Sequence, residues 1–382
     1  MFGLKKLKLK GSLNFMNAKL FIKKNAVMFI AMILAFITVL FVPIDKEYLN
    51  YFDFKTLSCL FCVLAVVCAL KNINFFYILA KNIVKLFKNT KMCILVLVYI
   101  TFIGSMLIAN DMALLTFLPL GYFVLSTTNK KQYMAFTFIM QNIAANLGGM
   151  LTPFGNPQNL YIYSSFNIPT LEFMGIMALP FIFAVVLITG CCLIFVKNEP
   201  LTIEDEPEKL NAKRAVVYLI LFTLSILIVF RSIPYVIGLI VIPLVLLFID
   251  RKALKEVDYP LLLTFVFFFI FSGNMARIPL VRELFSKLLQ KSTLLVSVIS
   301  CQFISNVPSA ILLSQFTDNH VELLWGVNIG GVGTLISSLA SLITFREYVK
   351  HNPNQSASYI GKFSVYNFAF LILLTSFVLI IK

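Results

Sequence analysis

The chain has 382 residues, of which 60% are hydrophobic and only 13% are charged. Several apolar runs approach the roughly 20 residues that a helix needs to cross a hydrocarbon core ~30 Å thick. This composition excludes a soluble globular protein and predicts an all-α polytopic membrane protein. The formal net charge of +15 does not indicate nucleic-acid binding. Basic residues collect in short loops between apolar runs, where they orient a protein in the membrane.

The N-terminal residues 1–24 are rich in lysine and predict a basic cytoplasmic tail. No small-residue cleavage site precedes the first apolar run, so we do not expect a removable signal peptide. Crossing helices are expected at residues 25–43 and 56–70. Apolar residues in 72–88 recur at helical spacing with lysines opposite. This pattern predicts an amphipathic helix at the membrane interface.

Residues 92–125 are long enough for two passes but are interrupted by Asn110 and Asp111. Lysines lie in the loops on both sides, so we predict a re-entrant helical hairpin that enters and leaves on the cytoplasmic side. A helix broken by glycine, proline and asparagine is expected at 132–165. A full crossing follows at 173–196.

A polar cytoplasmic linker at residues 197–214 divides the chain into an N-terminal half, 25–196, and a C-terminal half, 215–382. The second half repeats the plan of the first. Its elements are expected at 215–230, 234–249 and 260–272 (crossing helices), 276–291 (amphipathic helix), 292–316 (hairpin), 321–344 (broken helix) and 359–381 (last crossing helix).

The loop charges also predict the orientation. With the N-terminus inside and about 11 transmembrane segments, most of the basic residues lie on the cytoplasmic side. The first hairpin then opens toward the cytoplasm and the second toward the outside. We therefore expect two inverted repeats, which are typical of secondary transporters.

Both broken helices carry the motif Asn-x-Gly-Gly-x-x-Thr, at residues 146–152 and 328–334. Irregular backbone at membrane depth is tolerated only where it is buried or lines a polar cavity. The two breaks and the two hairpin tips are therefore expected to converge on one site. The ends of half-helices can hold an anion at their N–H groups and Na⁺ at their carbonyl groups.

Two sets of residues follow from this expectation. The expected substrate-binding residues are Asn110, Thr152, Asn156, Ser305, Asn306, Asn328 and Thr334. The expected residues for coupling to an ion or proton are Asp111, Asn110, Gly155, Asn306 and Gly331.

Asp111 stands out, because an ionisable group between two apolar helical arms is costly and is usually functional. The alternative is that Asp111 only caps the following helix at a tip that reaches water. The same alternative applies to Ser305 and Asn306. The glycine pairs of the two motifs could also serve only close helix packing.

Other polar residues indicate packing or loops. The seven cysteines lie in apolar runs and are expected to be packing thiols, despite the Cys59-x-x-Cys62 spacing. Gln141 and Asn142 are expected to pack between helices. Both histidines fall outside the predicted spans, so no nucleophile–base pair or metal site is expected at membrane depth. The chain is therefore not predicted to be an enzyme and is expected to need no cofactor, with Na⁺ as a candidate coupling ion.

Four stretches resemble the ion transporter superfamily: residues 146–159, the Asn-Asp tip, Ser-Asn-x-Pro-Ser at 305–309, and Gly-Val-Asn-Ile-Gly-Gly-x-Gly-Thr at 326–334. That superfamily includes arsenite permeases, citrate–metal carriers, divalent anion/sodium symporters and one class of Na⁺/H⁺ antiporters. The resemblance covers about residues 20–382. It implies a scaffold domain and a transport domain that moves like an elevator, usually within a homodimer.

By this resemblance, the triplets at 109–111 and 305–307 occupy positions where dicarboxylate symporters carry Ser-Asn-Thr. The first triplet lacks the serine and adds an acid, and the second lacks the threonine. The Asn-Asp pair and the Gly-Val-Asn segment favour the branch similar to arsenite permeases and citrate permeases.

The sequence therefore predicts a secondary active transporter in the plasma (inner) membrane. The expected substrate is a small anion, either a di- or tricarboxylate or an inorganic oxyanion, and transport is expected to be coupled to H⁺ or Na⁺. An arsenite or antimonite efflux permease and a Na⁺/H⁺ antiporter stay open as alternatives. A passive channel fits less well, because an inverted repeat with two opposed hairpins indicates alternating access.

Overall fold

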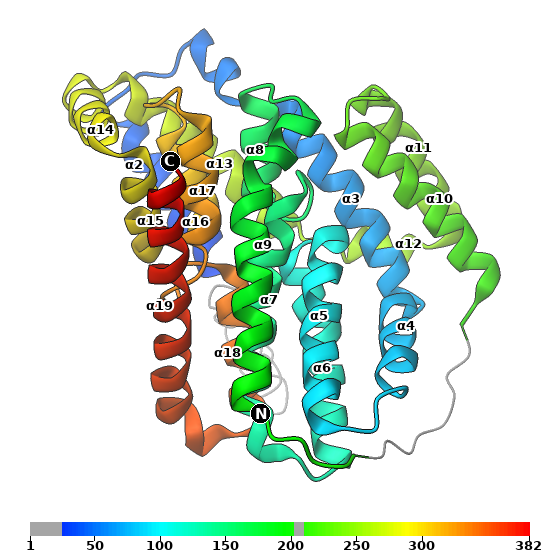
Figure 1. Ribbon diagram of the computed structural model, residues 1–382. Helices are drawn as coiled ribbons and strands as arrows, with labels where there is room; N and C mark the ends of the chain where they lie inside the picture. Colours follow the sequence, from blue (N-terminus) through cyan, green and yellow to red (C-terminus); the bar gives the residue numbers. More distant parts are fainter. Residues whose placement is uncertain (1–24, 202–209) are drawn as a thin grey trace, which may run out of the picture. The chain divides into compact units, whose positions relative to one another are not determined.

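The computed structural model describes residues 25–201 and 210–382 (Figure 1). The basic tail predicted at 1–24 and part of the predicted linker lie outside the described residues. Regular structure in the described part of the chain is helical throughout. Its one β contact is an isolated antiparallel bridge between Asn89 and Pro200.

The chain forms two compact units. One comprises Met1–Phe52 and Asp258–Arg282, and the other comprises Asp53–Val257 and Glu283–Lys382. This division does not follow the two predicted halves of the chain, because a helix of the second half packs against a helix of the first. The repeat boundaries therefore stay a prediction from the sequence.

The first unit is built around α2 (Ala26–Val39) and α13 (Tyr259–Arg277), which pack against each other. The Arg277 guanidinium binds the Asp45 carboxylate at 2.6 and 3.0 Å and the Tyr51 hydroxyl at 3.1 Å. Hydrogen bonding to Arg277 lowers the pKa of the Asp45 carboxyl below its ordinary value. These contacts fasten the loop that follows α2 to the end of α13.

The second unit contains most of the helices. In chain order they are α3 (Phe54–Asn72), α4 (Phe75–Val84), α5 (Thr90–Ile108), α6 (Asn110–Thr127), α7 (Met134–Gly148), α8 (Pro157–Ser165), α9 (Thr170–Phe195), α10 (Ala212–Val229), α11 (Tyr235–Ile249), α12 (Arg251–Lys255), α15 (Thr293–Ile304), α16 (Asn306–Leu313), α17 (His320–Ile329), α18 (Leu339–His351) and α19 (Ser356–Ile381). Helix α14 (Pro279–Lys291) runs across the boundary between the units.

Each hairpin and each broken helix that the sequence predicts corresponds to a pair of helices in the structure. The predicted hairpins correspond to α5–α6 and α15–α16, and the predicted broken helices correspond to α7–α8 and α17–α18. Within the second unit, Figure 1 shows the open end of α5–α6 at the lower edge of the view and that of α15–α16 toward the upper edge. The two hairpins therefore enter from opposite ends.

Six helices of the described residues are individually long and apolar enough to cross a membrane, or up to seven if a bent pair counts as one span. This number counts only helices that are long and apolar enough individually, whereas the apolar runs of the sequence predict about 11 segments. Two predicted crossings, α2 and α11, have only 14 and 15 residues, and two others are broken into half-helices. The class is confirmed: the chain is an all-α, multi-pass membrane protein.

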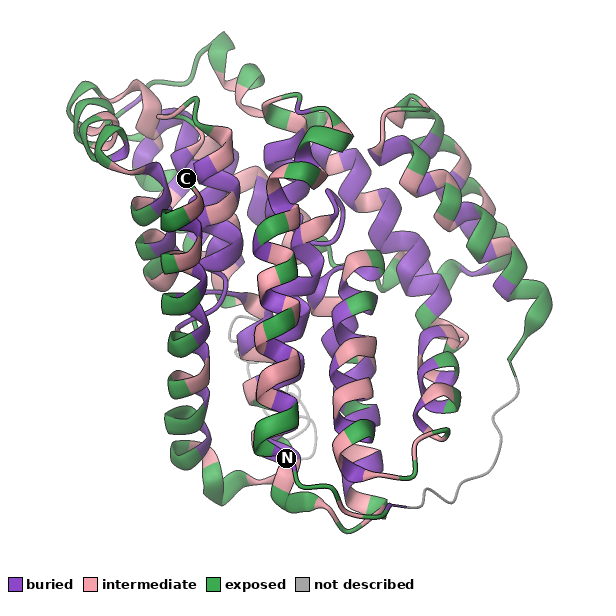
Figure 2. Ribbon diagram, viewed as in Figure 1, coloured by how far each residue is buried: buried purple, intermediate pink, exposed green. Residues whose placement is uncertain are grey.

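Burial separates a polar centre from an apolar periphery. Every residue of α7 except Phe136 is buried, whereas α9 and α19 expose large apolar side chains, such as Ile194 at 77% and Ile380 at 83% (Figure 2). Apolar side chains on the outer surface suit contact with lipid, and a fully buried helix suits the centre of a bundle. Helix α7, which carries the first break at its end, therefore lies at the core of the second unit.

Candidate substrate and ion site

The two hairpin tips adopt the same unusual backbone conformation. Ala109, between α5 and α6, has φ 67° and ψ 152°, and Ser305, between α15 and α16, has φ 75° and ψ 160°. Non-glycine residues rarely adopt such angles, which cost about 1–3 kcal/mol and cluster at functional sites. The two hairpins therefore turn at their tips in the same backbone conformation.

Each tip is completed by an asparagine in the same way. Asn110 Oδ1 accepts a hydrogen bond from the Asp111 N–H at 2.9 Å, and Asn306 Oδ1 accepts one from the Val307 N–H at 2.9 Å. These bonds satisfy one N–H at the start of α6 and of α16, where helices leave such groups without intrahelical partners. The asparagines shape both tips, although the triplets around them differ.

Each broken helix is fastened to its neighbouring hairpin by a threonine. Thr152 Oγ1 donates to the Met106 carbonyl at 2.8 Å, and Thr334 Oγ1 donates to the Gln302 carbonyl at 3.0 Å. Both carbonyls belong to the residue three positions before the tip. The threonines of the two repeated motifs thus form equivalent hydrogen bonds in the two halves of the chain.

A chain of buried asparagine side chains joins the first tip to both broken helices. Asn110 Nδ2 donates to Asn146 Oδ1 at 3.1 Å. Asn156 Nδ2 donates both to the Asn146 carbonyl at 3.1 Å and to Asn328 Oδ1 at 3.2 Å. None of these four residues is more than 3% exposed. The structure thus brings Asn110, Asn156 and Asn328 together in one network.

Asn328 is the most connected member of this network. Its Nδ2 donates to Asn159 Oδ1 at 2.6 Å and to the Leu324 carbonyl at 2.9 Å. Its Oδ1 also accepts from Gln158 Nε2 at 3.4 Å, besides Asn156. One side chain on α17 therefore links the start of α8 to the second break.

The second tip lies against the second break. The Asn306 N–H donates to the Ser337 carbonyl at 2.9 Å, and Ser305 Oγ donates to the same carbonyl at 3.3 Å. Ser337 Oγ in turn donates to the Gly331 carbonyl at 2.9 Å. A Cβ atom at Gly331 would lie 3.0 Å from the Asn306 Nδ2 atom. Ser305, Asn306, Gly331 and Thr334 therefore form a second group around the break that follows α17.

Two of the predicted coupling residues hold less central places. Asp111 is half-buried in the first turn of α6, directly after the tip. Gly155 lies in the loop between α7 and α8, where a Cβ atom would come within 2.3 Å of the Gly149 carbonyl oxygen. The position of Asp111 suits an ion or proton ligand. Gly155 allows its own backbone to lie against the backbone of Gly149.

Sequence reasoning missed several members of the site. Gln302 Nε2 donates to the Gly330 carbonyl at 2.9 Å, and its Oε1 accepts from the Thr334 N–H at 2.9 Å. One side chain thus pairs two backbone groups that the break in α17 frees. Asn146, Gln158 and Asn159 lie in the stretch that the sequence marked as irregular but were not named as binding residues, and Ser337 was not singled out. A polar residue inside an apolar hairpin arm was the available signal for Gln302.

A separate buried cluster serves packing, as the sequence indicated for Asn142. Its Nδ2 donates to Ser341 Oγ at 3.3 Å and to Asn367 Oδ1 at 3.5 Å, and its Oδ1 accepts from Thr344 Oγ1 at 3.4 Å. These bonds join α7, α18 and α19. The seven cysteines are free thiols, and all but Cys191 are buried.

The network offers ligands of two kinds. Asn156 Oδ1 and Gln158 Oε1 are buried amide oxygens that accept no hydrogen bond, and such oxygens suit a hard cation. Helices α6 and α16 begin at the tips, and the N-terminal ends of helices suit an anion. Among the described residues, no group of three or more histidine, cysteine or acidic side chains could hold a metal ion. The amide oxygens and the helix N-termini therefore suit the binding of ions.

Two hairpins that enter from opposite ends, and two broken helices joined to them by equivalent contacts, define the class of this protein. It is a multi-pass membrane transporter and not an enzyme. The chain belongs to the CitMHS citrate transporter family, whose model matches residues 15–322. This membership confirms the resemblance to the ion transporter superfamily that the motifs indicate.

Two relatives match most of the chain. An uncharacterized transporter, MJ0456, from Methanocaldococcus jannaschii is 32% identical over 302 residues, which cover 78% of this chain and 82% of the relative. The inner membrane protein YbiR from Escherichia coli K12 is 27% identical over 320 residues, which cover 80% of this chain and 83% of the relative.

Proposed function

We propose that this protein is a secondary active transporter that carries a small citrate-like anion, coupled to H⁺ or Na⁺, by an elevator-type alternating-access mechanism. Family membership supports the class of substrate. The observation that carries the proposal is the pair of equivalent hairpin tips, each fixed to a neighbouring broken helix by a threonine-to-carbonyl bond. Such discontinuous helices hold substrate and coupling ion in transporters.

The anion would be held mainly by backbone. Helices α6 and α16 start at Asn110 and Asn306, and their N-termini carry partial positive charge. The side chains of the network are amides and hydroxyls without a basic residue. Binding that relies on helix ends can be released easily, whereas a buried lysine or arginine would hold a carboxylate tightly.

Two groups are candidates for coupling. Asn156 Oδ1 and Gln158 Oε1 would coordinate Na⁺, because both are buried and accept no hydrogen bond. Asp111 would instead bind a proton or cation beside the first tip. Asp111 also supports a second candidate function, a Na⁺/H⁺ antiporter of the same superfamily, in which the carboxylate exchanges the two ions and no organic anion binds.

Orientation and assembly belong to the same proposal. Loop charges support a plasma-membrane protein with a cytoplasmic N-terminus. Hairpins that open at opposite ends of the second unit support the inverted repeat. The superfamily resemblance supports a homodimer.

A thermal-shift series on purified wild type and Asp111→Asn tests the substrate class and the role of Asp111. Citrate, succinate, sulfate and arsenite are added one at a time, with Na⁺ and pH varied. A ligand that binds the folded state raises the midpoint by mass action, by ~2.7 kcal/mol of stability at 100 times Kd. We expect citrate or a related carboxylate to stabilise the wild type, with Na⁺ or low pH strengthening the effect. Stabilisation by Na⁺ and pH alone, lost in Asp111→Asn, would identify the antiporter instead.

A further inference from the structure

A glutamate–lysine pair lies beside the open end of each hairpin, opposite the tip. We propose that Glu199 and Glu322 are positioning residues, which fasten the open end of each hairpin to a neighbouring segment and thereby fix the two tips in the binding geometry. This inference rests on the proposed function only in that the tips line the substrate site. The pairs themselves lie outside the asparagine network.

At the first hairpin, Glu199 contacts both arms. Its backbone carbonyl accepts from the N–H of Thr90, the first residue of α5, at 2.8 Å. Its carboxylate pairs with Lys130, which follows α6, at 2.5 Å. The Leu201 N–H also donates to the Lys88 carbonyl at 2.9 Å. A short segment after α9 thus ties together the two ends of α5–α6.

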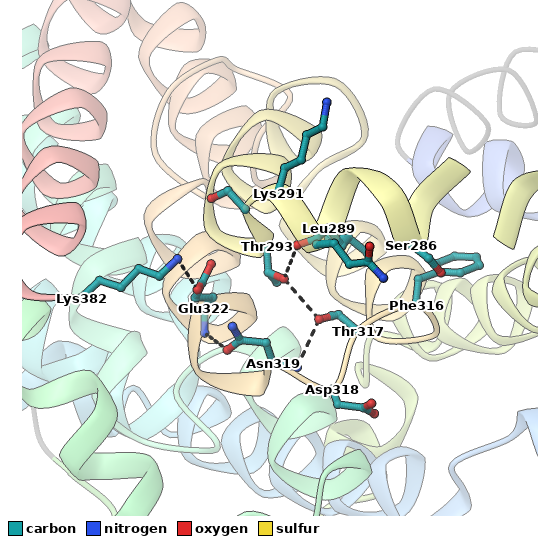
Figure 3. Close-up of a pocket in the computed structure, with 12 residues that line it drawn as sticks. Ser286, Leu289, Lys291, Thr293, Phe316, Thr317, Asp318, Asn319, Glu322 and Lys382 are labelled. Atoms are coloured by element: carbon teal, nitrogen blue, oxygen red, sulfur yellow. Dashed lines mark hydrogen bonds and ion pairs between the residues drawn. The ribbon is translucent and has the colours of Figure 1, made fainter. Parts of the chain in front are cut away.

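At the second hairpin, Glu322 lies on the neighbouring helix α17, beside Lys382 (Figure 3). Its Oε2 accepts from the N–H of Leu294, in the first turn of α15, at 2.9 Å, and its Oε1 pairs with Lys382 Nζ at 2.5 Å. Glu322 is only 6% exposed. A buried carboxylate of this kind is held in place by its partners, because losing one of them leaves a costly charge. Glu322 therefore ties α15 to α17 and to the end of α19.

A pocket lies beside each pair. A pocket of about 380 Å³ lies at the second pair, lined by Thr293, Thr317 and Lys382 among others. The two threonine hydroxyls bridge the arms at 3.2 Å (Figure 3). A pocket of about 670 Å³, lined partly by Thr127 and Lys130, lies at the first pair. Beside such a pocket, specific polar contacts help to hold the ends.

The position of a tip depends on both ends of its hairpin. Each tip is bound to a break by the bonds of Thr152 and Thr334, but the arms behind it can tilt if their open ends separate. Helix α17 carries Glu322 near its start and Asn328 near its end, so one short helix connects the second pair to the network. Loss of a glutamate–lysine pair should therefore loosen the tip of its own hairpin and leave the other tip unchanged.

A crossed labelling experiment tests this. Reporter cysteines are placed at the tips by Ala109→Cys and Ser305→Cys, and their reaction rates with a small thiol reagent are measured in the membrane, with the labelling of the otherwise unaltered chain subtracted. We expect Glu322→Gln to speed labelling at the second tip by roughly threefold to tenfold and to leave the first tip unchanged. Glu199→Gln should do the reverse.

The lysines supply the matched second variants. Lys382→Gln should speed labelling at the second tip less than Glu322→Gln does, because it removes the ion pair but keeps the charged acceptor of the Leu294 N–H. The double variant should match Glu322→Gln. Lys382→Gln keeps the buried carboxylate and its bond to the Leu294 N–H. It can therefore replace Glu322→Gln in the labelling experiment if Glu322→Gln folds poorly. Equal acceleration at both tips, or no change at either, would overturn the inference. The assay needs no substrate, so its outcome is independent of whether a citrate-like anion is carried.

Discussion

Asn328→Ala is expected to abolish anion-dependent stabilisation and transport. The substitution removes the acceptor of Asn156 and Gln158 and the donor to Asn159, all of which are buried. Each buried amide left unpaired costs about 1–3 kcal/mol. The first tip then loses its connection to the second break. The measurements are the thermal midpoint with and without ligand, and uptake into proteoliposomes.

Asn142→Ala is the matched control for this change. Asn142 is equally buried and also joins helices, through Ser341 and Asn367, but it lies in the packing cluster. It should lower the midpoint without removing the response to ligand. If Asn328→Ala kept the full ligand response, or if Asn142→Ala lost it, the asparagine network would not be the binding site.

Gly155→Ala is expected to reduce transport roughly tenfold or more, since forcing extra volume into a packed site costs about 1–3 kcal/mol. A Cβ atom at this position would lie 2.3 Å from the Gly149 carbonyl oxygen and 2.8 Å from the Gly149 Cα. Both are backbone atoms, which cannot rotate away as a side chain can. The loop that carries Asn156 must therefore shift. Initial rates of uptake, normalised to the amount of folded protein, measure the effect.

Gly190→Ala provides the comparison for Gly155→Ala. Gly190 lies in α9, and a Cβ atom there would have no neighbour within 4 Å. Alanine should be tolerated at Gly190, because its helix propensity exceeds that of glycine by about 1 kcal/mol. Normal transport in Gly155→Ala would show that the close contact between the backbones of Gly155 and Gly149 is not needed for the transport cycle.

The irregular elements were the most predictable part of the fold. Glycine, proline and asparagine inside apolar runs are costly in lipid, so Asn110, Ser305 and the two repeated motifs marked the tips and breaks. The structure places Asn110, Asn156 and Asn328 in one network because they lie at such interruptions. Local chemistry was therefore enough to locate these positions.

Properties that depend on tertiary contacts were not predictable. Gln302 belongs to no sequence motif. Its hydrogen bonds to Gly330 and Thr334 form only because the second break folds against α15. Helix α12 and the pairing of Glu199 with Lys130 likewise depend on which elements meet in space. The apolar runs predicted more crossings than the described residues have long helices, because α2 and α11 are short and two other crossings are broken into half-helices.

Driven uptake is the measurement that tests the central claim most directly. Purified protein is reconstituted into liposomes, and the accumulation of radiolabelled citrate is followed with an imposed H⁺ gradient, an imposed Na⁺ gradient, or neither. We expect citrate to accumulate above its external concentration with one of the two gradients, and this accumulation to collapse when an ionophore dissipates that gradient. Two results would contradict coupled citrate transport. In the first, citrate only equilibrates across the membrane, whichever gradient is imposed. In the second, citrate never enters the liposomes although Na⁺ and H⁺ are exchanged.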